Sequence, residues 1–237
     1  WRSILSVRSP WFPTDRVVTI SFTENKLGRH MIDTVIFDIG RVLAGYGWEK
    51  YLRSIVPEEK AYRAVEQAVF LSPAWVEHDK GLETEEEEIR DFVSAAPEYE
   101  KEIRQVYENL GECVWKLSYA VPWVQELKSQ GIRVFALSNW PKHIYDQRED
   151  KLDFLELMDG YILSWQEHVI KPDPAVFQLL MERYQIAPEQ AVFIDDTLVN
   201  IEAAGKLGIH GIHFQSLEQA KEELRKLGVR QADCLQG

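Results

Sequence analysis

The feature that most constrains this fold is a series of short apolar segments, which recur between amphipathic stretches from residue 34 onward. The segments read as buried strands at 34–38, 133–137, 160–164, 191–194 and 208–212. Strands that are apolar along their whole length are typical of parallel sheets covered on both faces. Helical periodicity between them predicts helices over 122–130, 141–158, 174–184, 199–207 and 217–227. We therefore expect an α/β fold, a Rossmann-like parallel sheet sandwiched by helices.

One long interval interrupts this alternation of strands and helices. Residues 47–118 contain no strand-like segment and read as a series of helices, one of which begins with a capping-box pattern at Thr84 and Glu87. An interval of about 70 residues is much longer than a crossover between parallel strands requires. We expect 47–118 to form an inserted α-helical cap, with the α/β core made of 31–46 and 119–237.

The first 30 residues differ in character from the rest of the chain. They contain more basic than acidic residues and show no sustained hydrophobic periodicity. A targeting peptide is one interpretation, but the compact apolar segment of such a signal is missing. We expect 1–30 to be an N-terminal extension outside the core, with Met31 as the natural start.

The charge balance limits the partners that this chain can bind. It has 39 acidic and 27 basic residues, a net charge of −12. Such a surface repels nucleic acid and anionic membranes unless a basic patch offsets it, and the sequence shows no such patch. Cys113 and Cys234 lie outside any metal-ligand spacing, which favours a reducing compartment. We expect a cytoplasmic protein that binds neither nucleic acid nor membranes; the sequence does not indicate an oligomeric state.

Carboxylates follow two of the predicted strands, at the edge where open α/β sheets place their sites. Asp38 ends the first strand, where a buried carboxylate needs a partner or a metal; a turn-forming aspartate is the alternative. Asp195 and Asp196 end another strand and repel each other unless a cation or hydrogen-bond donors neutralise them. Oxygen ligands of this kind suit Mg²⁺. Alternatively, one of the pair caps the next helix, and we expect Asp195 to be the less directly engaged.

Uncharged and basic residues follow two further strands. Ser138 and Asn139 can donate hydrogen bonds to an anionic oxygen, although such a pair is also common in turns. Lys171 precedes Pro172, which disfavours a helical backbone at the lysine. The next residues, Asp173 and Pro174, are typical of a helix start. Lys171 is thus placed directly before a helix, although most lysines lie on solvated surfaces.

Taken in order, these four motifs resemble those of the haloacid dehalogenase (HAD) superfamily over about residues 31–215. Phe37–Leu43 is similar to the FDxGxV first motif of a phosphatase branch that includes sugar-phosphate phosphatases. The insert lies where that branch has its C1 cap, and Trp75-x-x-His78-x-x-Gly81-x-x-Thr84 is similar to part of that cap. The resemblance implies a Mg²⁺-dependent phosphohydrolase that acts on a small phosphorylated metabolite, such as a sugar phosphate, through an aspartyl-phosphate intermediate.

The resemblance also implies a role for each motif residue. Asp38 matches the nucleophile, which is also a Mg²⁺ ligand. Ser138 and Asn139 match the residues that bind the transferring phosphoryl group. Lys171 matches the lysine that offsets the charges of nucleophile and phosphate. These roles agree with the chemistry, because phosphoryl transfer depends mostly on positioning and electrostatic stabilisation.

The remaining implied roles concern the metal. The backbone carbonyl of Gly40 matches a second Mg²⁺ ligand. In the acidic motif, Asp196 matches the metal-binding aspartate of a G-D-x-x-x-D pattern. Asp195 then stands at the glycine of that pattern and Asn200 at its second aspartate.

Two positions depart from the family pattern. Gly40 stands where most HAD phosphatases have an aspartate that acts as general acid and base. A catalytic factor of about 10²–10⁴ is thus missing or supplied elsewhere, for example by His78 of the insert. Arg41 stands where this branch often has asparagine; it could contact a substrate phosphate, but we expect it to face solvent.

Two other functions remain open from the sequence. A 2-haloacid dehalogenase would share the fold and the aspartate nucleophile but needs no metal, and the Asp195–Asp196 pair argues against it. A catalytically weak phosphate-binding domain is the other alternative, and Gly40 is its motivation.

Overall fold

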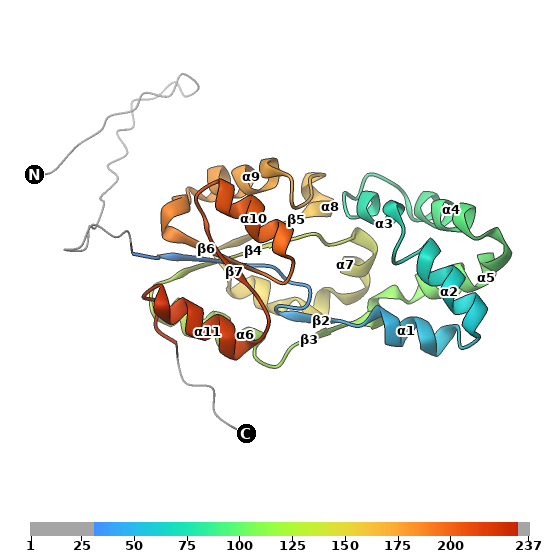
Figure 1. The fold of residues 1–237 in the computed structure, drawn as a ribbon, viewed down its shortest axis with the longest axis horizontal. Coiled ribbons are helices and arrows are strands. Elements are labelled where there is room, and N and C mark those ends of the chain that lie inside the picture. Colours follow the sequence, from blue (N-terminus) through green and yellow to red (C-terminus); the bar gives the residue numbers. More distant parts are fainter. Residues whose placement is uncertain (1–30, 232–237) are drawn as a thin grey trace, which may run out of the picture. The chain divides into compact units, whose positions relative to one another are not determined.

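The computed structural model describes residues 31–231, so the predictions for residues 1–30 and for Cys234 lie outside the described part (Figure 1). Its main sheet has five strands in the order β5-β4-β1-β6-β7, and every neighbouring pair is parallel. The strands are β1 (Thr34–Phe37), β4 (Arg133–Ser138), β5 (Gly160–Leu163), β6 (Ala191–Asp195) and β7 (His210–His213). The five predicted strands and the parallel α/β sheet are confirmed.

Helices cover both faces of this sheet, because alternate strand residues point to opposite sides. Phe37 of β1 packs with α6 (Ala120–Ser129) and α11 (Leu217–Lys226), and its ring meets Trp123 edge to face at 4.7 Å. Ile36 packs on the other face with α9 (Pro174–Tyr184) and α10 (Leu198–Lys206). Figure 1 shows the two helix pairs on opposite sides of the sheet. The predicted helical layers are therefore confirmed.

The helix predicted over 141–158 is wrong in its second half. Helix α7 (Lys142–Arg148) ends early, and two 3₁₀ turns follow, η3 (Glu149–Lys151) and η4 (Asp153–Leu157). Leu152, Phe154 and Leu155 are all buried.

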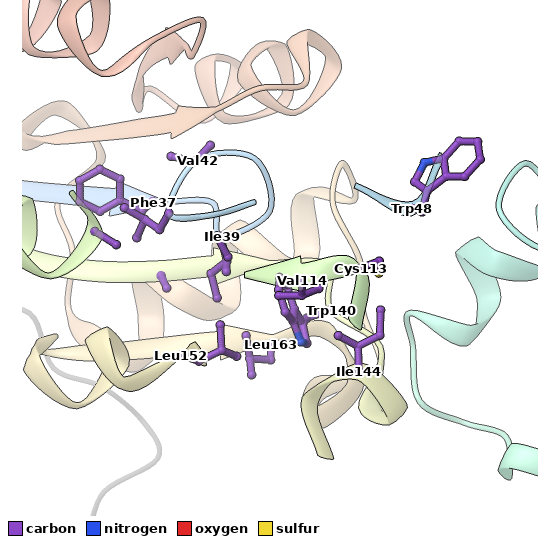
Figure 2. Close-up of a cluster of buried hydrophobic side chains, with 14 of the residues drawn as sticks. Phe37, Ile39, Val42, Trp48, Cys113, Val114, Trp140, Ile144, Leu152 and Leu163 are labelled. Atoms are coloured by element: carbon purple, nitrogen blue, oxygen red, sulfur yellow. The ribbon is translucent and has the colours of Figure 1, made fainter. Parts of the chain in front are cut away.

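The inserted segment is mostly helical. It contains α1 (Trp48–Ile55), α2 (Glu59–Ala68), α3 (Pro73–His78), α4 (Glu85–Ala95), η1 (Pro97–Tyr99), α5 (Glu100–Glu108) and η2 (Leu110–Cys113). The predicted capping box is confirmed, since Thr84 and Glu87 exchange hydrogen bonds at the start of α4. Figure 2 shows that buried side chains continue from Phe37 and Ile39 at the sheet towards Ile144 and the insert.

The expectation that 47–118 lacks a strand is wrong at its end. Strand β3 (Val114–Lys116) pairs antiparallel with β2 (Ala44–Tyr46), and Figure 1 shows both running between the sheet and the helices of the insert. A Cβ atom on Gly45 would lie 2.1 Å from the Trp115 ring, so a larger residue here would displace that ring. Such a short strand has no hydrophobic period of its own, and its partner is distant in sequence.

No helix among residues 31–231 has the length and apolarity needed to cross a membrane.

Candidate active site

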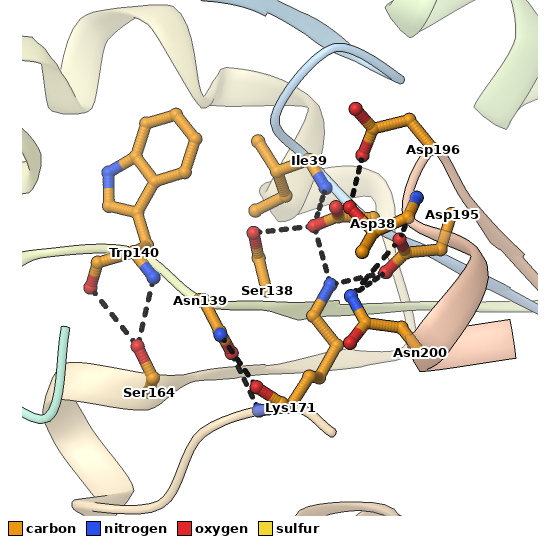
Figure 3. A network of polar contacts seen from close by, with 11 residues as sticks. Asp38, Ile39, Ser138, Asn139, Trp140, Ser164, Lys171, Asp195, Asp196 and Asn200 are labelled. Carbon is orange, nitrogen blue, oxygen red and sulfur yellow. Dashed lines mark hydrogen bonds and ion pairs between the residues drawn. The ribbon is translucent and has the colours of Figure 1, made fainter. Parts of the chain in front are cut away.

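Asp38 lies at the centre of a polar network at the carboxyl edge of the sheet (Figure 3). Its backbone N–H still continues the β1–β6 ladder, donating to the Ile194 carbonyl at 2.8 Å. The Oδ1 atom accepts hydrogen bonds at 2.7 Å from the Ser138 hydroxyl and from the Ile39 N–H. Because β1 and β4 are adjacent and in register, their ends bring Asp38 and Ser138 together.

Lys171 lies between two carboxylates and is almost fully buried. Its Nζ atom is 2.9 Å from Asp38 Oδ1 and 2.6 Å from Asp195 Oδ2. The segment that carries Lys171 precedes α9, where Asp173 caps the helix and Pro174 begins it, as predicted. The side chain of Asn139 exchanges two hydrogen bonds with the Lys171 backbone, at 2.8 and 3.0 Å. Asn139 therefore holds the lysine segment in place, and its amide is not directed towards Asp38.

The two adjacent aspartates differ sharply in their surroundings. Asp195 is fully buried and accepts hydrogen bonds from Lys171, from the Thr197 N–H at 2.7 Å and from Asn200 Nδ2 at 3.0 Å. The expectation that Asp195 is the less engaged is wrong for hydrogen bonding. The Asp196 side chain is 24% exposed, and its side-chain contacts are longer: Thr197 Oγ1 lies at 3.3 Å and Arg41 at 3.9 Å. Asp196 is thus the more available ligand for a cation.

The charges at this edge do not balance. Burial raises the pKa of Asp38 to about 6, opposed by Lys171 and reinforced by Asp195. Burial alone would lower the pKa of Lys171, but Asp38 and Asp195 outweigh it and raise that pKa, so the lysine stays charged. Burial and Asp195 together also raise the pKa of Asp196. Three carboxylates face the Lys171 ammonium group and, 3.9 Å from Asp196, the Arg41 guanidinium group, and one oxygen of each carboxylate lies within 4.8 Å of the others. This excess of oxygen ligands and negative charge fits a hard divalent cation such as Mg²⁺.

The turn after Asp38 places its backbone strain at Arg41 and not at Gly40. Arg41 has φ of 60°, whereas Gly40 does not have a positive φ, and a Cβ atom on Gly40 would meet no atom within 4 Å. The Arg41 side chain is half-exposed and lies near Asp196 and above the Tyr46 ring. It therefore borders the site, although it also contacts solvent.

The sequence reading missed Asp79, which follows α3 in the insert and is buried. The charges of Lys171 and Asp38 both act on its carboxyl group. The Trp75–Thr84 pattern indicated this segment, but the residue predicted from it was His78. The His78 ring instead packs on Phe92, and its Nδ1 lies 3.5 Å from Glu88. His78 and Asp79 are adjacent in sequence, and only the packing of the insert against the core shows which of them lies near the site.

Comparisons with known proteins agree with this geometry. The family model for haloacid dehalogenase-like hydrolases matches residues 32–208. Acyl-CoA dehydrogenase family member 10 of Mus musculus is 30% identical over 208 residues, which are 81% of this chain but 19% of that protein. A sesquiterpene phosphatase of Aspergillus oryzae is 24% identical over 81% of this chain and 94% of its own length. The chain thus spans about a fifth of the mouse relative and nearly all of the fungal one.

A solved structure is similar in fold. A HAD family enzyme from Bacteroides thetaiotaomicron, in complex with magnesium and inorganic phosphate, has a TM-score of 0.64 and is 21% identical, covering 79% of this chain and 96% of its own. At this identity the likeness concerns the fold, whereas the family model covers most of the chain. The chain belongs to the haloacid dehalogenase-like hydrolases and resembles their phosphatase branch.

Proposed function

We propose that this chain is a Mg²⁺-dependent phosphohydrolase that cleaves small phosphomonoesters, sugar phosphates among them, with Asp38 as nucleophile. The observation that carries the proposal is the contact of Lys171 Nζ with Asp38 and Asp195, at 2.9 and 2.6 Å, while Ser138 donates to the same Asp38 oxygen. A buried ammonium group beside a carboxylate is suited to an incoming phosphate, whose charge would otherwise repel the nucleophile.

The residues at the sheet edge have different roles in the proposed reaction. An Asp38 oxygen attacks phosphorus, the ester oxygen leaves, and water then cleaves the aspartyl-phosphate, which splits one difficult hydrolysis into two steps. Lys171 offsets the charge that accumulates on the transferring group, and the Ser138 hydroxyl holds the nucleophile in place by donating to Asp38 Oδ1. With a pKa of about 6, Asp38 is mostly ionised at neutral pH and is ready to attack.

The acidic side chains have a separate role in this proposal. Asp38, Asp196 and the backbone carbonyl of Gly40 would hold Mg²⁺, which supplies positive charge to the phosphoryl oxygens when bound. Asp195 orients Lys171 and Asn200 from its buried position. The magnesium and phosphate bound by the Bacteroides enzyme support this assignment, as does the phosphatase activity named for the fungal relative.

The helical insert, residues 47–118, has the role of a cap in this proposal. Ser164, at the start of α8 (Ser164–Glu167), donates a hydrogen bond to the Asp79 carbonyl, so the insert contacts the core next to the site. A cap in this position would select substrates and exclude water from the reaction.

A phosphate-release assay tests the proposal. The chain is incubated with sugar phosphates, nucleotides and phosphorylated cofactors, with Mg²⁺ and with EDTA, next to Asp38→Asn and the exposed control Asp146→Asn. We expect Mg²⁺-dependent release from the wild type and the control but not from Asp38→Asn. Metal-independent release of chloride from 2-chloropropionate would instead establish the dehalogenase alternative, which the surplus of carboxylates disfavours.

A further inference from the structure

The proposed reaction needs a proton donor that the sheet edge does not supply. An alkoxide is a poor leaving group, so its oxygen must gain a proton as the bond to phosphorus breaks. Gly40 has no side chain, and the Ser138 hydroxyl donates to Asp38. Two carboxylates raise the pKa of Lys171, which makes it a weak acid at neutral pH. None of these three residues can readily supply the proton, whereas the insert carries a buried carboxyl group next to this edge.

Asp79 lies in the insert at the place where it meets the core. It follows α3 directly and is 8% exposed. The backbone carbonyl of Asp79 accepts a hydrogen bond from the Ser164 hydroxyl. That hydroxyl in turn accepts one from the backbone N–H of Trp140 at 2.9 Å. Trp140 is two residues beyond Ser138, so these contacts fix Asp79 to the loop that carries part of the site. Figure 3 shows this Trp140–Ser164 contact beside the Asp38 network.

The carboxyl group of Asp79 is buried but incompletely bonded. Within residues 31–231, its Oδ1 atom has no hydrogen-bond partner. An ionised carboxylate with a bare buried oxygen is costly, and the group keeps its proton instead. Burial raises the pKa of Asp79 to about 8; Lys171 opposes this rise, and Asp38 and Glu88 add to it. At pH 7 the group is therefore an acid with a proton to give, and its Oδ1 has a free hydrogen-bonding position.

We propose that Asp79 is the general acid and base of this site, an inference that rests on the proposed phosphohydrolase function. In the first step Asp38 forms a bond to phosphorus, the ester P–O bond breaks, and the Asp79 proton passes to the leaving oxygen. In the second step a water oxygen bonds to phosphorus, the Asp38–phosphorus bond breaks, and the Asp79 carboxylate takes a proton from that water. Each cycle returns both aspartates to their starting forms.

The experiment compares two leaving groups in Asp79→Asn. A simple alkyl phosphate needs the proton, so its kcat/KM should fall by about 10²–10⁴-fold. With p-nitrophenyl phosphate, whose leaving group needs little protonation, the loss in the first step should be less than about tenfold. The matched control is Glu77→Gln, an exposed carboxylate on α3, which should leave both substrates unchanged. Equal losses on both substrates would overturn the assignment.

The wild type provides a second test that does not depend on a folded variant. Its kcat/KM for the alkyl phosphate should decline above about pH 8, as Asp79 loses its proton, while that for p-nitrophenyl phosphate continues without this decline. A decline shared by both substrates would contradict the role of Asp79. If the role of Asp79 is contradicted in this way but p-nitrophenyl phosphate is still cleaved and the cleavage requires Asp38, the proposed phosphohydrolase function stands. Absence of turnover on every phosphate ester would remove both proposals together.

Discussion

The buried charges at the sheet edge and those in the insert have different surroundings. Asp38 and Asp195 share one cation, Lys171, in short contacts of 2.9 and 2.6 Å. In the insert, within the described residues, both ring nitrogens of His78 and one oxygen of Asp79 are buried without hydrogen bonds. The sheet edge is preorganised for charge stabilisation, which costs no rearrangement during reaction. The insert keeps unused hydrogen-bonding capacity, which is consistent with the cap role proposed for it.

The largest change should come from removing the nucleophile. Asp38→Asn keeps the shape of the side chain but removes its nucleophilic charge, and we expect kcat to fall by about 10⁴–10⁶-fold. The fold should persist, because burial already disfavours the charged form of Asp38. Phosphate release and circular dichroism measure the two effects. A variant that retains a tenth of the activity would contradict the covalent mechanism.

Lys171→Ala should affect both turnover and folding. It removes the charge that acts on the transferring phosphoryl group, and we expect kcat to fall by about 10²–10³-fold. It also leaves Asp38 and Asp195 buried without their cation, which should cost about 3–5 kcal/mol of unfolding free energy. Denaturant unfolding and steady-state kinetics separate these losses. A change confined to KM would mean that the lysine only binds substrate.

The unfolding free energy should depend on pH through Asp79 of the insert, and a comparison with Asp79→Asn isolates this contribution from that of the sheet edge. Asp79 keeps its proton in the folded chain up to about pH 8 but loses it near pH 4 when unfolded, so its stabilising contribution is complete below pH 4 and declines as pH rises. Asp79→Asn lacks this decline. Between pH 6 and 8 its unfolding free energy, relative to wild type, should rise by about 1.4 kcal/mol per pH unit. A pH-independent difference would mean that Asp79 is ionised in the folded chain.

The two adjacent aspartates should separate under magnesium titration. Asp196→Asn removes the more exposed ligand, and we expect the Mg²⁺ concentration for half-maximal activity to rise by about tenfold. Asp195→Asn should mainly lower the thermal stability, because Asp195 accepts bonds from Lys171 and Asn200. Identical titration curves for both variants would show that the primary ligand is misassigned.

The smallest effect should come from restoring an acid at the turn. Gly40→Asp should fold, because Gly40 does not adopt a positive φ and its Cβ position is open. In the Asp79→Asn background it should raise alkyl phosphate turnover by a few fold, as a second source of the proton. An unchanged substrate profile in a well-folded double variant would place position 40 out of reach of the leaving group.

The sequence predicted the sheet edge better than the insert, for a physical reason. Parallel strands bring their carboxyl ends together, so Asp38, Ser138 and Asp195 could be grouped from the apolar segments that precede them. The importance of Asp79 depends on how α3 meets Ser164, a contact between segments far apart in the chain. No local pattern records such a contact, and the same holds for the pairing that defines β3.

The pairing of β2 with β3 also determines how the insert can be exchanged. Tyr46 and Val114 are partners in this ribbon, so the segment between them leaves and re-enters the core at one place. A helical module of another length, grafted between these two residues, would not alter the register of the five-stranded sheet. The ribbon therefore marks the two ends between which the insert could be replaced while the polar network at the sheet edge stays in place.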